Sequence, residues 1–192
     1  MKPQMLKKLT ALGLLALATA SAPADISNPT QAGRNTIGQV TNMETKDGFS
    51  AQFWMTTDEQ IFSSWTKPGA LRNLKPIDEI KRNTPIYLAL FVANPGAKGP
   101  TNPGAKQSTA TSDVTFDLYV VNPSGALSVA YKQRPGWKGL SPSPGLVYLA
   151  KDRGTLNFEA IDPLGEYAVV VIIHDNVRKA DIKLTRKLTL VE

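Results

Sequence analysis

The side chains best suited to chemistry are His174 and the acid beside it, Asp175, at the end of an apolar run. A histidine oriented by a carboxylate can act as a general base. Successive residues of a strand point to opposite faces, however, so adjacent positions are poorly placed to pair. The pattern therefore favours a histidine at a strand end, in a turn with Asn176, over a catalytic pair.

The residue inventory excludes several other kinds of site. The sequence has one histidine and no cysteine. A zinc triad of histidines, thiolate ligation, a thiol nucleophile, a disulfide and a cysteine-anchored lipid are therefore excluded. No serine stands in a Gly-x-Ser-x-Gly elbow, and Asp152, Asp162 and Asp175 lack the Asp-x-Asp spacing of a calcium loop. We expect no metal and no cofactor, whereas a glycosidase-like carboxylate pair stays open because its spacing is spatial.

The basic balance of the chain does not indicate nucleic-acid binding. The formal net charge is +6, but residues 1–24 contain three lysines and no acid, so half of it lies there. The other basic residues are scattered, whereas a surface that follows phosphates needs a stripe of them with aromatic side chains between. We therefore expect no nucleic-acid partner.

Residues 1–24 have the layout of a secretory signal peptide. Lys2, Lys7 and Lys8 precede the apolar run 9–17, and small residues allow cleavage after Ala20 or Ala24. The alternative is a membrane anchor, but the apolar run is too short to span a bilayer. We expect export to the periplasm or beyond, with no membrane insertion after cleavage.

The next part of the chain divides into a leader and an extension. Residues 25–48 are polar and rich in turn formers at their start, which predicts a flexible leader. Residues 49–56 alternate, which predicts a half-buried strand, and 57–60 have capping-box spacing, which predicts a helix over 58–66. We expect 49–76 to form a strand–helix extension that packs on the main domain as a flap.

Residues 77–192 have the pattern of an all-β domain. Apolar residues alternate, or run continuously between turn signals, in seven segments without an intervening helix. This predicts an antiparallel β-sandwich of about seven strands. Arg186 interrupts the apolar face of the last segment, which is typical of an edge strand or a bulge. The seven segments are 86–93, 114–120, 127–131, 146–149, 156–160, 167–173 and 182–190.

Two long loops are candidate partner-binding regions. Residues 94–112 contain the sequence Asn-Pro-Gly-Ala-Lys twice, ending at Lys98 and Lys106, and such a loop is either a binding loop or a tolerated insertion. Residues 134–145 are rich in proline and glycine and contain Trp137 and Lys138. Trp137 is either an exposed interface anchor or a plug that closes the end of the sandwich.

The segment from Asp162 to Tyr167 carries a resemblance to known families. A glycine and a tyrosine at 165 and 167, entering an apolar strand, resemble the tyrosine corner of immunoglobulin-like sandwiches. Residues 77–191 are similar to the macroglobulin-type branch of that architecture. With Trp137-Lys138-Gly139, the chain also resembles uncharacterised exported bacterial proteins that share this sandwich domain. The resemblance implies that Gly165 and Tyr167 form a structural corner, and it implies no catalysis.

Together these observations predict an exported, periplasmic, non-catalytic protein that binds an unknown envelope protein through loops or a sheet edge. The alternative is a cell-wall-directed enzyme or enzyme inhibitor, which needs converging carboxylates, or His174 with an acid, in a concave pocket. Strand donation to an assembly partner is a third possibility, and Arg186 argues against the last strand in that role.

Overall fold

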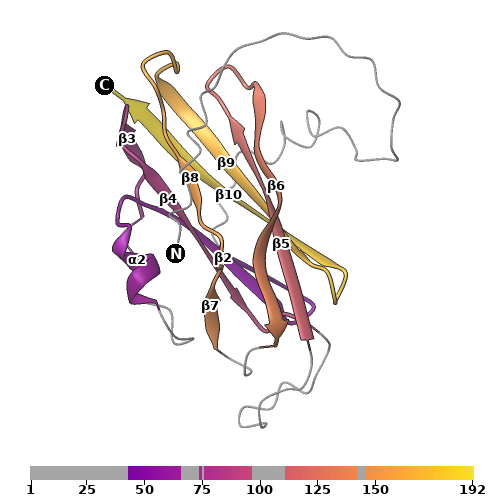
Figure 1. Cartoon of the computed structure of the whole chain (residues 1–192). Coiled ribbons are helices and arrows are strands. Elements are labelled where there is room, and N and C mark those ends of the chain that lie inside the picture. Colours follow the sequence, from indigo (N-terminus) through magenta and orange to yellow (C-terminus); the bar gives the residue numbers. More distant parts are fainter. Residues whose placement is uncertain (1–42, 66–73, 75, 97–110, 142–145) are drawn as a thin grey trace, which may run out of the picture. The chain divides into compact units, whose positions relative to one another are not determined.

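The computed structural model describes residues 43–65, 74, 76–96, 111–141 and 146–192. In these ranges the chain forms ten strands and one short helix (Figure 1). The helix in these ranges is not long and apolar enough to cross a membrane. The elements are β1 (Met43–Lys46), β2 (Phe49–Thr56), α2 (Gln60–Ser64), β3 (Glu79–Lys81), β4 (Ile86–Ala93), β5 (Thr111–Val121), β6 (Leu127–Leu140), β7 (Val147–Leu149), β8 (Gly154–Leu156), β9 (Gly165–Asp175) and β10 (Ala180–Val191).

The strands form two sheets, which confirms the all-β prediction. The first sheet has the order β1-β2-β4-β7, and β8 pairs with β4 beside β7. The second has the order β3-β10-β9-β5-β6, and its β3–β10 pair is parallel, whereas all other pairs in both sheets are antiparallel. Figure 1 shows the two layers, with α2 outside the first sheet.

Alternate residues of the strands fill the space between the sheets. Each strand presents every second side chain to the core because its pleat has a period of two. The buried core combines side chains of both sheets, and burying each large one contributes roughly 1.5–3 kcal/mol. Its fully buried large members include Phe49, Phe53, Met55, Ile86, Leu118, Ile173, Ile182, Leu184, Leu188 and Leu190.

The first strands are more deeply integrated than the sequence predicts. β2 pairs with β4 along all but its first residue, from Ser50↔Ala93 to Thr56↔Tyr87. It is therefore an inner strand of the first sheet, and the prediction that this strand packs on the main domain as a flap is wrong. β1 lies inside the range 25–48 that was expected to be a flexible leader, yet it forms a four-residue ladder with β2. Residues 1–42, which include the expected signal peptide, lie outside the described residues.

The helix is shorter than the expected 58–66 and is capped differently. It has no side-chain cap at Glu59; instead the Asp58 Oδ1 accepts the Gln60 N–H at 2.8 Å, an Asx-type turn. Ile61 is buried and packs on Ala89 and Phe91, which point away from the sandwich core on β4. A five-residue helix is not stable alone, so this contact holds it in place.

Strand β6 extends through most of the segment expected as the loop 134–145. It runs to Leu140 and pairs with β5, including Trp137 with Val114 and Pro135 with Thr115. Proline is tolerated because β6 is the edge strand of its sheet, and register shifts along β5 mark bulges. The strand expected at 156–160 lies instead at 154–156, although Phe158 is still buried in the core.

Arg186 points inward, as expected, from a strand that is only partly at an edge. β3 pairs with β10 only over Thr189–Val191. Arg186 is 7% exposed and donates to the Asp78 Oδ1 at 3.1 Å, with its guanidinium 5.7 Å from the Trp54 ring centre. The buried charge of Arg186 is therefore paired with Asp78. It lies where the edge of β10 that faces β3 has no strand paired to it among the described residues.

The corner before β9 has the expected hydrogen bond. The Tyr167 hydroxyl donates to the Pro163 carbonyl at 2.8 Å, four residues upstream. Gly165 has a φ of +128°, and a Cβ there would lie 3.2 Å from the Pro123 ring. Phe158 packs against the Tyr167 ring, with their centroids 4.6 Å apart. The two corner residues thus join the loop before β9 to the core.

We expect Tyr167→Phe to lower the free energy of unfolding by about 1–2 kcal/mol at neutral pH, because the Pro163 carbonyl loses its donor. Burial, and secondarily the Asp162 charge, raise the pKa of Tyr167 above its ordinary 10.0. The folded state therefore holds this proton more tightly, and stability falls as pH rises from 10 through the raised pKa. Phenylalanine cannot ionise, so only the parent loses stability in this way. The difference in unfolding free energy between parent and variant, measured by urea titration, should therefore narrow above pH 10. A constant difference would contradict this.

Candidate functional site

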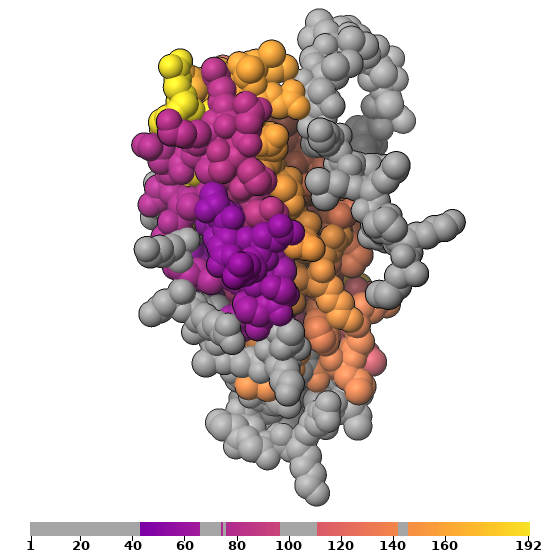
Figure 2. Space-filling model, turned by 60° about the vertical axis from the view of Figure 1, so that its left-hand side comes forward, coloured from indigo at the N-terminus to yellow at the C-terminus, as the bar shows by residue number. Residues whose placement is uncertain are grey.

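A groove of about 750 Å³ lies beside α2. One wall is α2 with the residue before it and Trp65 after it, and the other walls come from β6 and the β7–β8 segment. In Figure 2 the purple residues that include α2 lie at the surface next to orange residues of the later chain. The lining residues are Glu59, Gln60, Phe62, Ser63, Trp65, Trp137, Leu149, Ala150, Lys151 and Arg153.

Three aromatic rings give the groove its shape, and each is held by a second ring. Phe62 meets Tyr87 with centroids 6.3 Å apart, Trp65 meets Phe91 at 4.9 Å, and Trp137 meets Tyr148 at 4.9 Å. All three pairs are edge-to-face, the arrangement that the quadrupoles of aromatic rings favour. The lining rings are therefore fixed in orientation by the first sheet.

Two cations of the groove lie over these rings. The Lys151 Nζ is 4.8 Å from the Trp137 ring centre, and the Arg153 guanidinium carbon is 5.3 Å from that of Phe62. Arg153 also forms an ion pair with Glu59 at 2.9 Å, in which both side chains are about half exposed. The groove thus combines aromatic surface with two positioned positive charges.

An interruption in one strand places both cations. β7 and β8 pair with the two ends of β4, and between them the Ala150 N–H donates to the Leu90 carbonyl at 2.8 Å. The Lys151 N–H donates to the Gly136 carbonyl of β6 at 2.9 Å, which joins the edges of the two sheets. Asp152 forms an ion pair with Arg134 at 2.8 Å, whereas its neighbours Lys151 and Arg153 line the groove.

The structure places the partner-binding candidates of the sequence in different surroundings. Trp137 is half-buried: it packs on Tyr148 at the margin of the core, its Nε1–H donates to the Leu140 carbonyl at 3.2 Å, and it lines the groove. The ring therefore packs against the core and also forms part of the groove wall. Lys138 is 81% exposed, forms an ion pair with Asp113 at 3.5 Å and is not among the groove residues. Lys98 and Lys106 lie outside the described residues.

Neither the two cations nor the groove position of Phe62 and Trp65 was predicted from the sequence. Phe62 and Trp65 have the spacing of core residues, but they contact the outer face of β4 and also line the groove. Lys151 and Arg153 belong to no recognisable motif. The sequence shows only that Asp152 stands between them, in a polar segment that follows the apolar residues 146–149.

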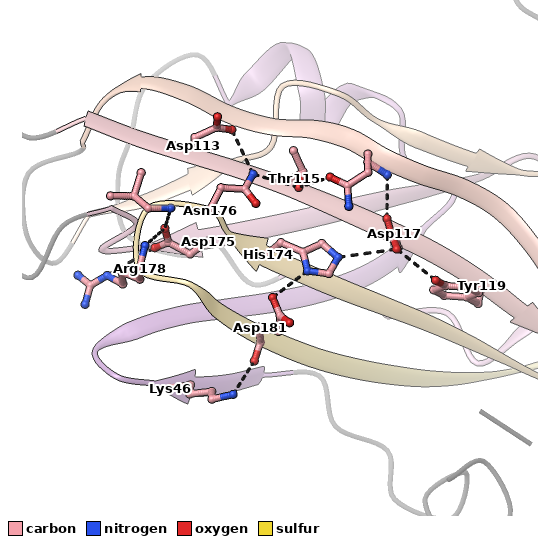
Figure 3. Close-up of polar contacts among 12 residues, drawn as sticks. Lys46, Asp113, Thr115, Asp117, Tyr119, His174, Asp175, Asn176, Arg178 and Asp181 are labelled. Atoms are coloured by element: carbon pink, nitrogen blue, oxygen red, sulfur yellow. Dashed lines mark hydrogen bonds and ion pairs between the residues drawn. The ribbon is translucent and has the colours of Figure 1, made fainter. Parts of the chain in front are cut away.

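His174 belongs to a separate polar cluster on the outer face of the second sheet (Figure 3). Its Nδ1 is 2.8 Å from the Asp181 Oδ1, and its Nε2 is 3.7 Å from the Asp117 Oδ2. Asp117 also accepts the Tyr119 hydroxyl at 3.1 Å. Burial, followed by the Asp117 charge, raises the pKa of Tyr119 above its ordinary value.

His174 and Asp175 do not pair, as strand geometry predicts, and His174 lies at the end of β9, where the turn begins at Asn176. The partners of the His174 ring come from the neighbouring strands β5 and β10. The Asp175 side chain is fully buried and accepts backbone N–H groups, among them that of Gly96 at 2.7 Å. His174 does not line the groove, so its acids do not meet the condition of a concave pocket there.

Comparison with known proteins gives no family. No family model matches the chain, and no curated protein is detectably similar to it. A Niemann-Pick type C2 protein from the Japanese carpenter ant aligns over 80% of this chain and 94% of its own, with 8% identity and a TM-score of 0.41. A family 123 glycoside hydrolase from Clostridium perfringens aligns over 74% and 27%, with 8% identity and a TM-score of 0.35. These values are too low to assign the chain either protein's fold or function.

Proposed function

We propose that this chain is an exported, non-catalytic protein of the periplasm that binds another envelope protein through the groove beside α2. The observation that carries the proposal is the position of Trp137. Its ring is fixed by Tyr148, carries Lys151 on its face and lines a groove with two further aromatic rings. Tryptophan and arginine in partly enclosed positions dominate the energetics of protein interfaces.

The groove supports binding better than the edge of β6 does. Gly136 and Arg134 on β6 are already tied to Lys151 and Asp152. The Tyr131 hydroxyl also donates to the Thr155 carbonyl of β8 at 3.1 Å. An incoming strand would have to displace these contacts, whereas a segment entering the groove would not.

The same geometry gives the enzyme alternative little support. Glu59 is the one carboxylate among the described groove-lining residues, and it pairs with Arg153 while accepting the Tyr87 hydroxyl at 3.2 Å. Hydrolysis of a glycosidic bond by two carboxylates requires a second acid across the cleft. Because the described lining residues include no second acid, the groove is better suited to binding than to this reaction.

The proposal includes an immunoglobulin-like, macroglobulin-type sandwich. The strand order β10-β9-β5-β6 beside β2-β4-β7 is that expected of such a sandwich if β4, β5, β9 and β10 are its strands B, C, F and G. A tyrosine corner at the start of β9 fits the same assignment. Loops and clefts at the margins of these sandwiches are general recognition surfaces.

Photo-crosslinking in cells tests the proposed function. A photoreactive residue at Ser63, on the groove rim, should give a discrete adduct with an envelope protein, and one at Lys183, exposed on β10 of the other sheet, should not. Trp137→Ala should lower the adduct yield about tenfold, equivalent to ~1.4 kcal/mol of binding free energy. Trp137→Phe, which keeps a ring against Tyr148, controls for stability. Equal adducts at both positions, or an unchanged yield in both variants, would contradict the proposal.

A further inference from the structure

We propose that the segment of the partner that enters the groove is an acidic peptide, whose Asp or Glu carboxylates pair with Lys151 and Arg153. This rests on the proposed function and names the chemistry that the groove selects.

The cations around the groove differ in whether an acid already neutralises them. Arg134 has Asp152 at 2.8 Å and Lys138 has Asp113 at 3.5 Å. Lys151 has no carboxylate within 4 Å in the described part of the chain, and its contact is the Trp137 ring. Its positive charge is therefore available to an incoming anion.

Arg153 is available in part. Its partner Glu59 is 58% exposed, Arg153 itself is 48% exposed, and exposed ion pairs of this kind contribute only about 0–1 kcal/mol. A carboxylate of a partner can share the guanidinium or replace Glu59. With one acid against two cations, the charged groups of the described lining sum to +1, which complements an acidic ligand.

The ring contacts position both cations before a ligand arrives. A free lysine or arginine loses up to about 2 kcal/mol of rotamer entropy when it is immobilised. Here Lys151 already lies on Trp137 and Arg153 on Phe62, so part of this loss occurs on folding. Preorganised charges bind carboxylates more tightly than flexible ones.

The same contacts disfavour a saccharide. Sugar rings bind proteins by stacking on open aromatic faces, but here cations cover a face of Trp137 and of Phe62. Tyr148 and Tyr87 also pack edge-to-face against the same two rings. The charged groups are thus the more accessible recognition elements, and a peptide with carboxylates fits them better than an uncharged glycan.

Selection from a phage library of random peptides on the immobilised protein tests the inference. Peptides recovered by the parent should be enriched in Asp and Glu, and the double variant Lys151→Gln/Arg153→Gln should lose this enrichment. Binding of the selected peptides should weaken about tenfold to hundredfold in the double variant, since each lost charge-assisted contact costs 1.4 kcal/mol or more. Lys132→Gln/Lys183→Gln, two exposed lysines elsewhere, is the charge-matched control and should bind as the parent does.

The variant Glu59→Gln should have the opposite effect on peptide binding. Removing this acid frees Arg153, so the selected acidic peptides should bind the variant several-fold more tightly and with a steeper dependence on salt. Recovery of neutral or basic peptides, equal weakening by both double variants, or binding of an oligosaccharide array instead would overturn the acidic-peptide inference alone. Recovery of no peptide that distinguishes the parent from Trp137→Ala would overturn the proposed function itself.

Discussion

Asp175→Ala is expected to lower the free energy of unfolding by about 3–5 kcal/mol, because it removes a fully buried carboxylate and leaves its partners unpaired. Its Oδ2 accepts the Gly96 N–H at 2.7 Å, and its Oδ1 accepts the N–H groups of Val177 and Arg178 at 3.1 and 3.0 Å. The Arg178 Nε lies 3.5 Å from the same carboxylate.

The effect is large because Arg178 depends on this acid. Its guanidinium donates to the carbonyls of Asp47, in the β1–β2 turn, and Asn94, after β4, at 2.6 and 3.0 Å. The carboxylate therefore joins the β9–β10 turn of one sheet to two turns of the other, directly at Gly96 and through Arg178. Figure 3 shows Asp175 beside Arg178. Without this carboxylate, the nearly buried Arg178 guanidinium keeps only backbone carbonyls as acceptors among the described residues.

Urea denaturation measures this loss, and Asp181→Ala is the matched control. Asp181 is 63% exposed and pairs with His174, so its removal should change stability by no more than about 1 kcal/mol. A loss below about 1 kcal/mol in Asp175→Ala would show that the buried network contributes little beyond its desolvation cost.

Asp175 also shows what strand periodicity can and cannot reveal. The period of two predicts correctly that His174 and Asp175 face opposite sides, and it locates each of the main core strands. It does not predict β1 or β3, because a polar four-residue strand and a three-residue strand bury too little for an alternating pattern. Proline and glycine at 135 and 136 suggest a loop, although an edge strand accommodates both.

The groove could not be predicted from the sequence for a different reason. Its walls come from α2, β6 and the β7–β8 segment, and the two cations reach it because one strand is interrupted after Leu149. Sequence patterns describe which face a residue occupies within its own element. They do not describe which elements meet, so Trp137 could be recognised as a candidate but its neighbour Lys151 could not.

Phe91→Ala is expected to lower the free energy of unfolding by about 3–5 kcal/mol and to remove the groove before the sandwich unfolds. Phe91 is 1% exposed, but it points away from the main core, and with Ala89 and Ile61 it forms the buried cluster under α2. Its ring also holds Trp65 edge-to-face at 4.9 Å. The helix has five residues, and the Asp58 side chain accepts only the Gln60 N–H at its start, so this packing is its main support.

Hydrogen exchange separates the two effects. In Phe91→Ala, protection of the Trp65 amide, which donates to the Ile61 carbonyl at 3.0 Å, should be lost under conditions where the amides of β9 are still protected. Leu118→Ala, a truncation in the core between the sheets, should cost a similar free energy but leave α2 and the Ser63 crosslink intact at low temperature. If Leu118→Ala and Phe91→Ala reduce crosslinking equally at matched stability, the groove does not depend on the cluster under α2, and the binding surface must lie elsewhere on the sandwich.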